Sequence, residues 1–218
     1  MKFRILTTVA LLSLALGANA QSMKTVKLNK PNMKAGGKLM EAFSKRSSSV
    51  EWTAAKLSTQ DLSNLLWAAN GINRPDEGKR TAPSAINAQE IDVYVFLEEG
   101  AYLYNAKENT LESVVEGDFR EVVIGPRPGS VTPTSQPPLL IILVADVSRF
   151  GEGRTEGRWL QIAAMDAGIV SQNIGLYCAA TGLVTRPRAS MDMDKIKEVL
   201  KLSDTQHPML NHPIGYAK

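Results

Sequence analysis

The sequence contains few residues of the kinds that usually form covalent cross-links or metal sites. Its 218 residues include one cysteine and two histidines. Cys178 alone cannot form an intrachain disulfide, and its apolar neighbours at helical spacing favour a core position over a catalytic thiol. His207 and His212 both precede a proline and have no other ligands grouped nearby, which argues against a metal site. We interpret both histidines as surface or tail-packing residues.

Apolar runs of more than ten residues are absent except near the start of the chain, where residues 5–16 are predominantly apolar. Two basic residues precede this run, and the small-x-small sequence Ala18-Asn-Ala20 follows it. These features predict a secretory signal peptide over residues 1–20 and a mature chain that begins at Gln21. The run is shorter than the ~20 residues that span a bilayer, so we expect no stable membrane insertion after signal removal. The expected location is therefore outside the cytoplasm, in the periplasm.

Neither sign of charge dominates the rest of the sequence. Beyond residue 20 the chain carries 23 basic and 22 acidic side chains, and no stretch concentrates lysine and arginine. A nucleic-acid-binding surface needs such a concentration, so nucleic acid is excluded as a partner class. The length and the 44% apolar content suit a single globular domain over residues 21–218.

Hydrophobic periodicity predicts an α+β domain. The longest helix is expected at residues 158–181, closed by Gly182, and its apolar character on nearly all sides indicates burial in the core or in a dimer interface. The segment 138–147 contains six aliphatic residues in a row, at 139–144, and predicts a strand covered on both faces. The remaining expectations are helices at 38–43, from a cap at Ser58 to Gly71, and at 192–202, strands at 92–97, 101–104 and 111–115, an ordered loop at 70–87, and an irregular tail at 203–218.

Two segments have the chemistry of a binding site. Arg46 with Ser47, Ser48 and Ser49 combines one cation with hydroxyl donors, which suits a phosphate monoester, although serine runs are also common in ordinary loops. Residues 80–89 join small residues, a proline and two amides just before a strand. Such a segment can present backbone and amide groups to a flat heterocycle, and a plain solvent loop is the alternative.

These two segments, together with motifs in the second half of the chain and in this order, resemble the FMN-dependent nitroreductase family, especially its branch of azoline-oxidising dehydrogenases. The motifs that carry the resemblance extend over most of the mature chain. They are Lys45-Arg46-Ser47-Ser48-Ser49, Leu65-Leu66-Trp67-Ala68-Ala69-Asn70-Gly71, Arg80-Thr81-Ala82-Pro83-Ser84-Ala85 with Asn87 and Gln89, Asp166-Ala-Gly168, Gln172-Asn173, Gly182-Leu183 and Ile214-Gly215-Tyr216.

The resemblance implies an α+β fold with a central antiparallel sheet flanked by helices, and an intertwined homodimer that holds FMN at each subunit interface. Arg46 and Ser47 would hold the phosphate, with Arg188 or Lys218 completing that site. Ser49 would lie near the ribityl and pyrimidine end, where the family often has a basic residue. Six further positions would surround the flavin ring: Pro83, Ser84, Asn87 and Gln89, from the same or the opposite subunit, and Val184 and Thr185 near the reactive edge.

The activity implied by the resemblance is a two-electron, ping-pong transfer to or from a small organic substrate, such as a nitroaromatic, a quinone or an azoline-like compound. Flavin N5 would carry the chemistry, so no side chain has to act as an acid or base and no metal is required. The alternative is a flavin- or small-ligand-binding protein without turnover, for which the missing cation at Ser49 is the main argument. Arg186-Pro187-Arg188 also departs from the family's glycine-rich stretch after the long helix.

Overall fold

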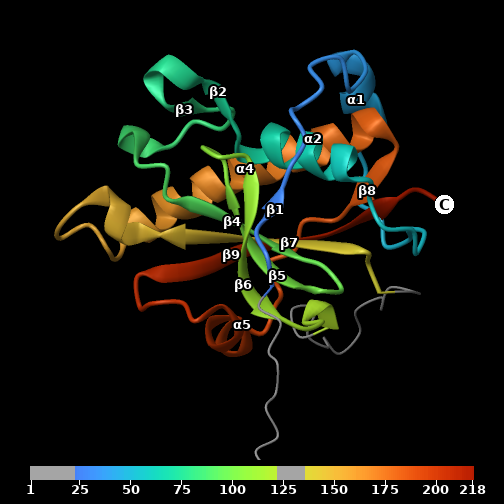
Figure 1. Cartoon of the computed structure of the whole chain (residues 1–218). Coiled ribbons are helices and arrows are strands. Elements are labelled where there is room, and N and C mark those ends of the chain that lie inside the picture. Colours follow the sequence, from blue (N-terminus) through green and yellow to red (C-terminus); the bar gives the residue numbers. More distant parts are fainter. Residues whose placement is uncertain (1–22, 122–135) are drawn as a thin grey trace, which may run out of the picture.

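A seven-stranded antiparallel sheet forms the centre of the protein in the computed structural model, which describes residues 23–121 and 136–218 (Figure 1). The strand order is β1-β6-β5-β4-β7-β9-β8. The predicted signal peptide at residues 1–20 lies outside the described residues. The sheet strands are β1 (Val26–Lys27), β4 (Ile91–Phe96), β5 (Gly100–Asn105), β6 (Thr110–Glu116), β7 (Leu139–Asp146), β8 (Leu183–Thr185) and β9 (Gln206–Tyr216).

Helices cover both faces of this sheet. Helices α1 (Leu39–Lys45), α2 (Thr59–Asn70) and α4 (Arg158–Thr181) lie on one side, and α5 (Met193–Leu200) lies on the other (Figure 1). The predicted α+β fold with a central antiparallel sheet flanked by helices is therefore confirmed.

Strand β7 connects the two halves of the core because it is buried along almost its whole length. It pairs with β4 on one side and with β9 on the other. Successive side chains of a strand point to opposite faces. Leu139, Ile141 and Leu143 thus pack with α2 and α4, while Leu140 and Ile142 pack with α5. The continuous apolar sequence is explained by this double coverage.

Helix α2 begins where the sequence places its cap. The Ser58 hydroxyl accepts a hydrogen bond from the Asp61 backbone N–H at 3.0 Å. The Asp61 carboxylate in turn accepts a 2.6 Å hydrogen bond from the Tyr216 hydroxyl, and this hydroxyl accepts another from the Ser58 backbone N–H at 3.1 Å. The start of α2 is therefore fastened to the last strand of the sheet.

Helix α4 spans the predicted residues, and Gly182 ends it in a left-handed conformation with φ of 76°. One side packs into the core through residues such as Val170 and Ile174. The opposite side is not covered within one chain, because Met165 is 65% exposed and Ile169 is 37% exposed. No helix in the described residues is long and apolar enough to cross a membrane.

The prediction of an irregular tail after residue 203 is wrong. Residues 206–216 form β9, an eleven-residue strand between β7 and β8. Prolines usually argue against an internal strand because they lack an N–H donor. Pro208 and Pro213 are accommodated because β8 pairs only with residues 214–216, and the register with β7 shifts next to Pro208. His212 lies in this strand and is fully buried.

The segment at residues 70–87 has more regular structure than predicted. Strands β2 (Ile72–Arg74) and β3 (Lys79–Arg80) form a small separate antiparallel sheet, joined through the 3-10 turn η1 (Pro75–Glu77). Gly78 closes that turn with φ of 64°, which a residue with a side chain rarely adopts. The pair is short and lacks alternation, which explains why the sequence pattern indicated only a loop.

Candidate functional site

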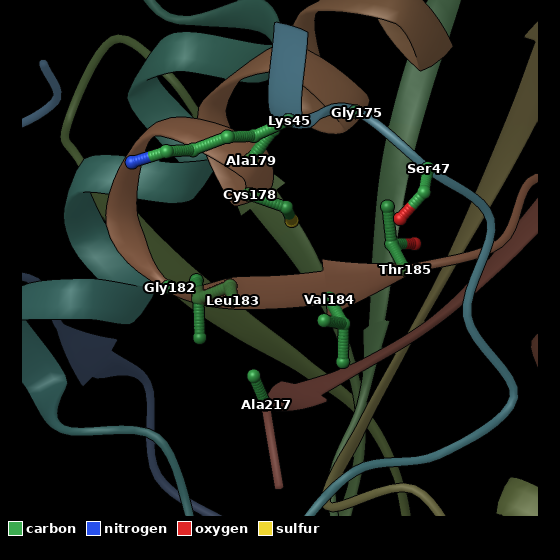
Figure 2. A pocket seen from close by; sticks show the side chains of 10 residues that line it. All are labelled: Lys45, Ser47, Gly175, Cys178, Ala179, Gly182, Leu183, Val184, Thr185 and Ala217. Carbon is green, nitrogen blue, oxygen red and sulfur yellow. The ribbon is translucent and has the colours of Figure 1, made fainter. Parts of the chain in front are cut away.

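A cavity of about 170 Å³ lies where the C-terminal ends of α1 and α4 meet β8 (Figure 2). Its walls combine small residues of the helix end with polar residues of the neighbouring segments. The lining residues are Lys45, Ser47, Gly175, Cys178, Ala179, Gly182, Leu183, Val184, Thr185 and Ala217. Small side chains at the end of α4 leave the space open, and Cys178 is buried in the wall.

Backbone pairing brings the serine segment after α1 against the edge of the sheet. Ser48 forms a parallel bridge with Thr185, and the Ser49 backbone N–H donates to the Thr185 carbonyl at 3.0 Å. This pairing places Ser47 beside Thr185 on the cavity wall (Figure 2). Two segments that are far apart in sequence therefore present hydroxyl groups to one space.

The cation that lines the cavity is not the one that the sequence suggested. Lys45 lines it, whereas Arg46, the C-cap of α1, is exposed and is absent from the lining. The Lys45 ammonium lies 2.6 Å from the Glu41 carboxylate, one helical turn earlier. Both side chains are more than half exposed, so this ion pair is weak and can be exchanged for another anion.

Ser49, Arg188 and Lys218, the other predicted contacts on this side of the site, are absent from the cavity lining. The Ser49 hydroxyl accepts a hydrogen bond from the Glu51 backbone N–H at 3.1 Å. Arg188 is half-buried and forms two backbone hydrogen bonds with Asn211, at 2.9 and 2.8 Å. Lys218 is exposed and follows Ala217, which lines the cavity and donates its N–H to the Gly182 carbonyl at 3.1 Å.

The second predicted segment forms a loop around the 3-10 turn η2 (Ala85–Asn87), with Pro83 exposed and Ser84 half-buried before it. Three of its non-glycine residues have a positive φ: Ile86 at 50°, Asn87 at 58° and Gln89 at 51°. For a β-branched residue such as Ile86 this conformation is a marked outlier. Strain of this kind persists only where surrounding contacts fix the backbone, and it is concentrated at functional sites.

Hydrogen bonds from several elements fix this loop. The Gln89 side chain accepts a 2.9 Å bond from Arg80 and donates a 2.9 Å bond to the Gly78 carbonyl. Its backbone N–H donates to the Ser84 hydroxyl, and its carbonyl accepts from Arg149, both at 2.9 Å. Gln89 thus supports the loop conformation, while the Asn87 side chain is exposed.

A pair of buried acids, Glu90 and Asp166, lies beneath the loop. The Asp166 carboxylate accepts a 2.8 Å hydrogen bond from the Ala85 backbone N–H and so ties the loop to α4. Glu90 is fully buried, and its carboxylate oxygens have no hydrogen-bond partner among the described residues. Burial, together with the adjacent Asp166 carboxylate, raises the pKa of Glu90 to about 7 against the opposing effects of a backbone hydrogen bond and Arg149. No metal-binding group of acids, histidines or cysteine occurs in the described residues.

In one chain the loop meets the N-terminal half of α4, whereas the cavity lies at its C-terminal end. The loop is bonded beside Asp166, whereas the cavity borders α4 from Gly175 to Gly182. At 1.5 Å per residue the two are separated by about 14 to 24 Å along the helix axis. Figure 1 shows the same arrangement, with β2 and β3 near one end of α4 and α1 and β8 near the other. One chain therefore does not bring the two predicted halves of the site together.

Comparisons with known proteins give a consistent match. The model of the "Nitroreductase family" matches residues 43–216. A candidate nitroreductase from Methanocaldococcus jannaschii is 27% identical over 186 residues, which cover 82% of this chain and 90% of that protein. The crystal structure of a candidate nitroreductase from Ralstonia eutropha is 32% identical and covers 91% of both chains, with a TM-score of 0.81. A chain of the Escherichia coli microcin synthetase McbBCD complex shares the fold, with a TM-score of 0.70 and 18% identity over 97% of this chain and 85% of that one.

The buried Glu90 carboxyl predicts a pH-dependent stability. Its folded-state pKa of about 7 lies above the ordinary value of 4.5, so its contribution is fully present below pH 4.5 and is lost as the pH rises through 7. As the pH rises from 4.5 to 8.5, the free energy of unfolding of the unmodified protein should fall by about 3 kcal/mol relative to that of Glu90→Gln, whose side chain stays neutral. Urea unfolding at several pH values measures this difference.

The exposed acid Glu108, in the turn between β5 and β6, provides the matched control. Glu108→Gln should follow the unmodified protein at every pH. If the stability curves of Glu90→Gln and the unmodified protein remain parallel from pH 4.5 to 8.5, Glu90 does not take up a proton in the folded protein near neutral pH.

Proposed function

The chain belongs to the nitroreductase family, whose members are oxidoreductases that generally use flavin cofactors, and from this premise we propose that it binds FMN and catalyses a ping-pong, two-electron transfer. The partner in that transfer is a small organic substrate such as a nitroaromatic, a quinone or an azoline-like compound. The observation that carries the proposal is the cavity at the end of α4, which is lined by Lys45, Ser47 and Thr185. The Lys45 ammonium, which points away from the two hydroxyl groups in Figure 2, would turn toward a bound phosphate. We also propose that the mature protein is exported to the periplasm, as its N-terminal sequence pattern predicts.

The donors at the cavity fit a phosphate monoester and the ribityl chain attached to it. Lys45 supplies a positive charge, and Ser47 and Thr185 supply hydroxyl groups. Charge-assisted hydrogen bonds to phosphate are among the stronger polar contacts in proteins. A bound phosphate could replace the Glu41 carboxylate as the partner of Lys45 at little cost in free energy, since the Lys45–Glu41 ion pair is exposed. Because these donors suit one terminal phosphate, they favour FMN over a dinucleotide. Arg46 and Lys218 remain proposed as further cations at the rim.

The size of the cavity supports a site shared by two subunits. Ligand sites usually enclose about 300–1,000 Å³, which is more than this cavity provides. Large apolar side chains are exposed on the two helices that border it, α1 and α4, and a surface of this kind usually marks an interface. They are Leu39, Met40 and Phe43 on α1 and Met165 and Ile169 on α4. We therefore propose that a second copy of the chain covers this surface.

A two-fold axis across α4 would complete the site. Two such helices would run antiparallel, so the loop end of one would lie beside the cavity end of the other. In this dimer the cavity of one subunit holds the phosphate and ribityl part, and Pro83, Ser84 and Asn87 of the other subunit line the flavin ring. Gln89 shapes that loop. Val184 and Thr185, which the resemblance placed near the reactive edge of the flavin, line the cavity and would instead contact the ribityl-phosphate part, and Arg188 lies on the same side.

The residues of this chain bind and orient the cofactor, and none is proposed as a catalytic acid or base. When bound, FMN supplies two-electron chemistry at its N5 position. The fixed loop presents backbone groups to a flat ring without needing to reorganise, because its strained conformation is already held by Asp166, Arg80 and Arg149. Ser49 stands where the family often has a basic residue, so other groups at the cavity would have to stabilise the negative charge of the reduced cofactor.

Cofactor binding tests the proposal directly. The purified protein should release FMN on denaturation, and Lys45→Ala should weaken FMN binding by roughly tenfold or more because a charged contact to phosphate is lost. Fluorescence titration of the cofactor-free protein measures the affinity, with Arg46→Ala in parallel to compare the two neighbouring cations. Lys24→Ala is the control, and an equal affinity for all four proteins would reject the phosphate-binding role.

Mixed dimers test the shared site. Ser47→Trp fills the cavity, and Asn87→Trp obstructs the exposed loop tip, so each variant alone should lose FMN. A heterodimer of the two, isolated through different tags, should regain one FMN per dimer because one site then combines an intact cavity with an intact loop. If both halves came from the same subunit, the heterodimer would bind none, and light scattering that gives a monomer mass with FMN bound would also contradict the arrangement.

Turnover distinguishes an enzyme from a flavin carrier. Photoreduced protein should be reoxidised by a quinone or nitroaromatic at a rate that saturates with acceptor concentration, since the acceptor must first bind beside the flavin. Stopped-flow absorbance in the flavin band follows this reaction, with free FMN as the control. Slow reoxidation that rises linearly with the concentration of every acceptor would support the carrier instead.

A further inference from the structure

His212 lies directly behind the cavity wall. It is fully buried in β9, beside Ile141 of β7, and its Nδ1 lies 3.2 Å from the Thr185 hydroxyl. Its other ring nitrogen, Nε2, has no hydrogen-bond partner among the described residues. Thr185 lines the cavity, so the imidazole contacts a residue of the cavity wall.

The ring is neutral and can therefore carry its proton on either nitrogen. Burial lowers the pKa of His212 to about 4, so the imidazole is uncharged at neutral pH. With the proton on Nε2, a buried N–H would have no acceptor, and Thr185 would have to donate its only hydrogen to Nδ1. With the proton on Nδ1, the imidazole donates to Thr185, and only a lone pair on Nε2 is left unpaired.

The second arrangement is favoured because of where the free hydrogen lies. Orphaned buried N–H groups are rarer than under-used acceptors. A hydroxyl oxygen that accepts a hydrogen bond can still donate its own hydrogen. Thr185 lines the cavity, so an acceptor for that hydrogen can come from a ligand, whereas Nε2 of His212 is buried without a partner among the described residues.

We propose that His212 is a positioning residue, which donates from Nδ1 to Thr185 and so keeps the Thr185 hydroxyl hydrogen available to an oxygen acceptor in the cavity. The inference rests on the proposed FMN site, where the acceptor is an oxygen of the ribityl-phosphate chain. The neighbouring Lys45 and Ser47 suit the same chemistry, because both can donate to oxygen. His212 itself touches neither cofactor nor substrate.

The tautomer can be measured before any ligand is added. The chain has two histidines, so nitrogen-15 NMR of labelled protein and of His207→Leu assigns the ring signals of His212 without ambiguity. We expect a neutral ring protonated on Nδ1 at pH 7. A proton on Nε2, or a charged ring, would overturn the proposal whether or not FMN binds.

A double-mutant cycle tests the coupling. Thr185→Val and His212→Leu should each weaken FMN binding by roughly five- to tenfold, as expected for the loss of one hydrogen bond. The double variant should bind no more weakly than Thr185→Val, because His212 acts only through that hydroxyl, and Thr185→Ser should retain the affinity. Losses that multiply in the double variant, or full affinity in His212→Leu, would reject the role.

Two further arms separate the possible outcomes. If Thr185→Val weakens FMN and riboflavin equally, the acceptor is a ribityl oxygen, and if it weakens FMN alone, the acceptor belongs to the phosphate. His207→Leu is the control, since His207 is only partly buried on the same strand and should leave both affinities unchanged. An unmodified protein that binds neither compound would refute the proposed cofactor, whereas normal binding with multiplying losses would refute only the role of His212.

Discussion

Helix α4, with 24 residues, packs against the core on one side and carries apolar side chains at the surface on the other. One side packs on the sheet and α2, where each fully buried aliphatic side chain contributes roughly 1.5–3 kcal/mol. The other side carries Met165 and Ile169 at the surface. Because the loop is attached beside Asp166 and the cavity lies beyond Gly175, the length of this rigid helix fixes the distance between them. In the proposed dimer, a second chain would bring the two regions close enough to share one ligand.

The sequence predicted the structure best where apolar residues recur at the spacing of a helix or strand that packs on the core. The limits of α4 and of β7 follow from long apolar runs with a clear end, and the start of α2 follows from the pairing of Ser58 with Asp61. Strand β9 was missed because its two prolines obscured the alternation. Leu210, His212 and Ile214 recur at every second residue, and that spacing could have indicated both a strand and a buried histidine.

The site was predictable in chemistry more than in detail. Two adjacent cations at a helix end point about 100° apart around the axis, so spacing alone could not decide that Lys45 rather than Arg46 lines the cavity. The loop at residues 83–89 was recognised, but its strained backbone and the internal bonds of Gln89 depend on Arg80, Arg149 and Asp166, which only the tertiary fold brings together.

The two sides of the cavity differ in how firmly their polar groups are held. At the rim, Lys45 and Glu41 form an exposed ion pair that solvent weakens and that an incoming phosphate can replace. Behind the wall, His212 and Asn211 are fully buried, and their bonds to Thr185 and to the 188–190 backbone have no water to compete with them. Binding is thus expected to rearrange the rim while the β8 and β9 side keeps its geometry, because only exposed contacts can be exchanged cheaply. The specificity for an oxygen acceptor would then reside in the buried pair, and the affinity in the exposed cation.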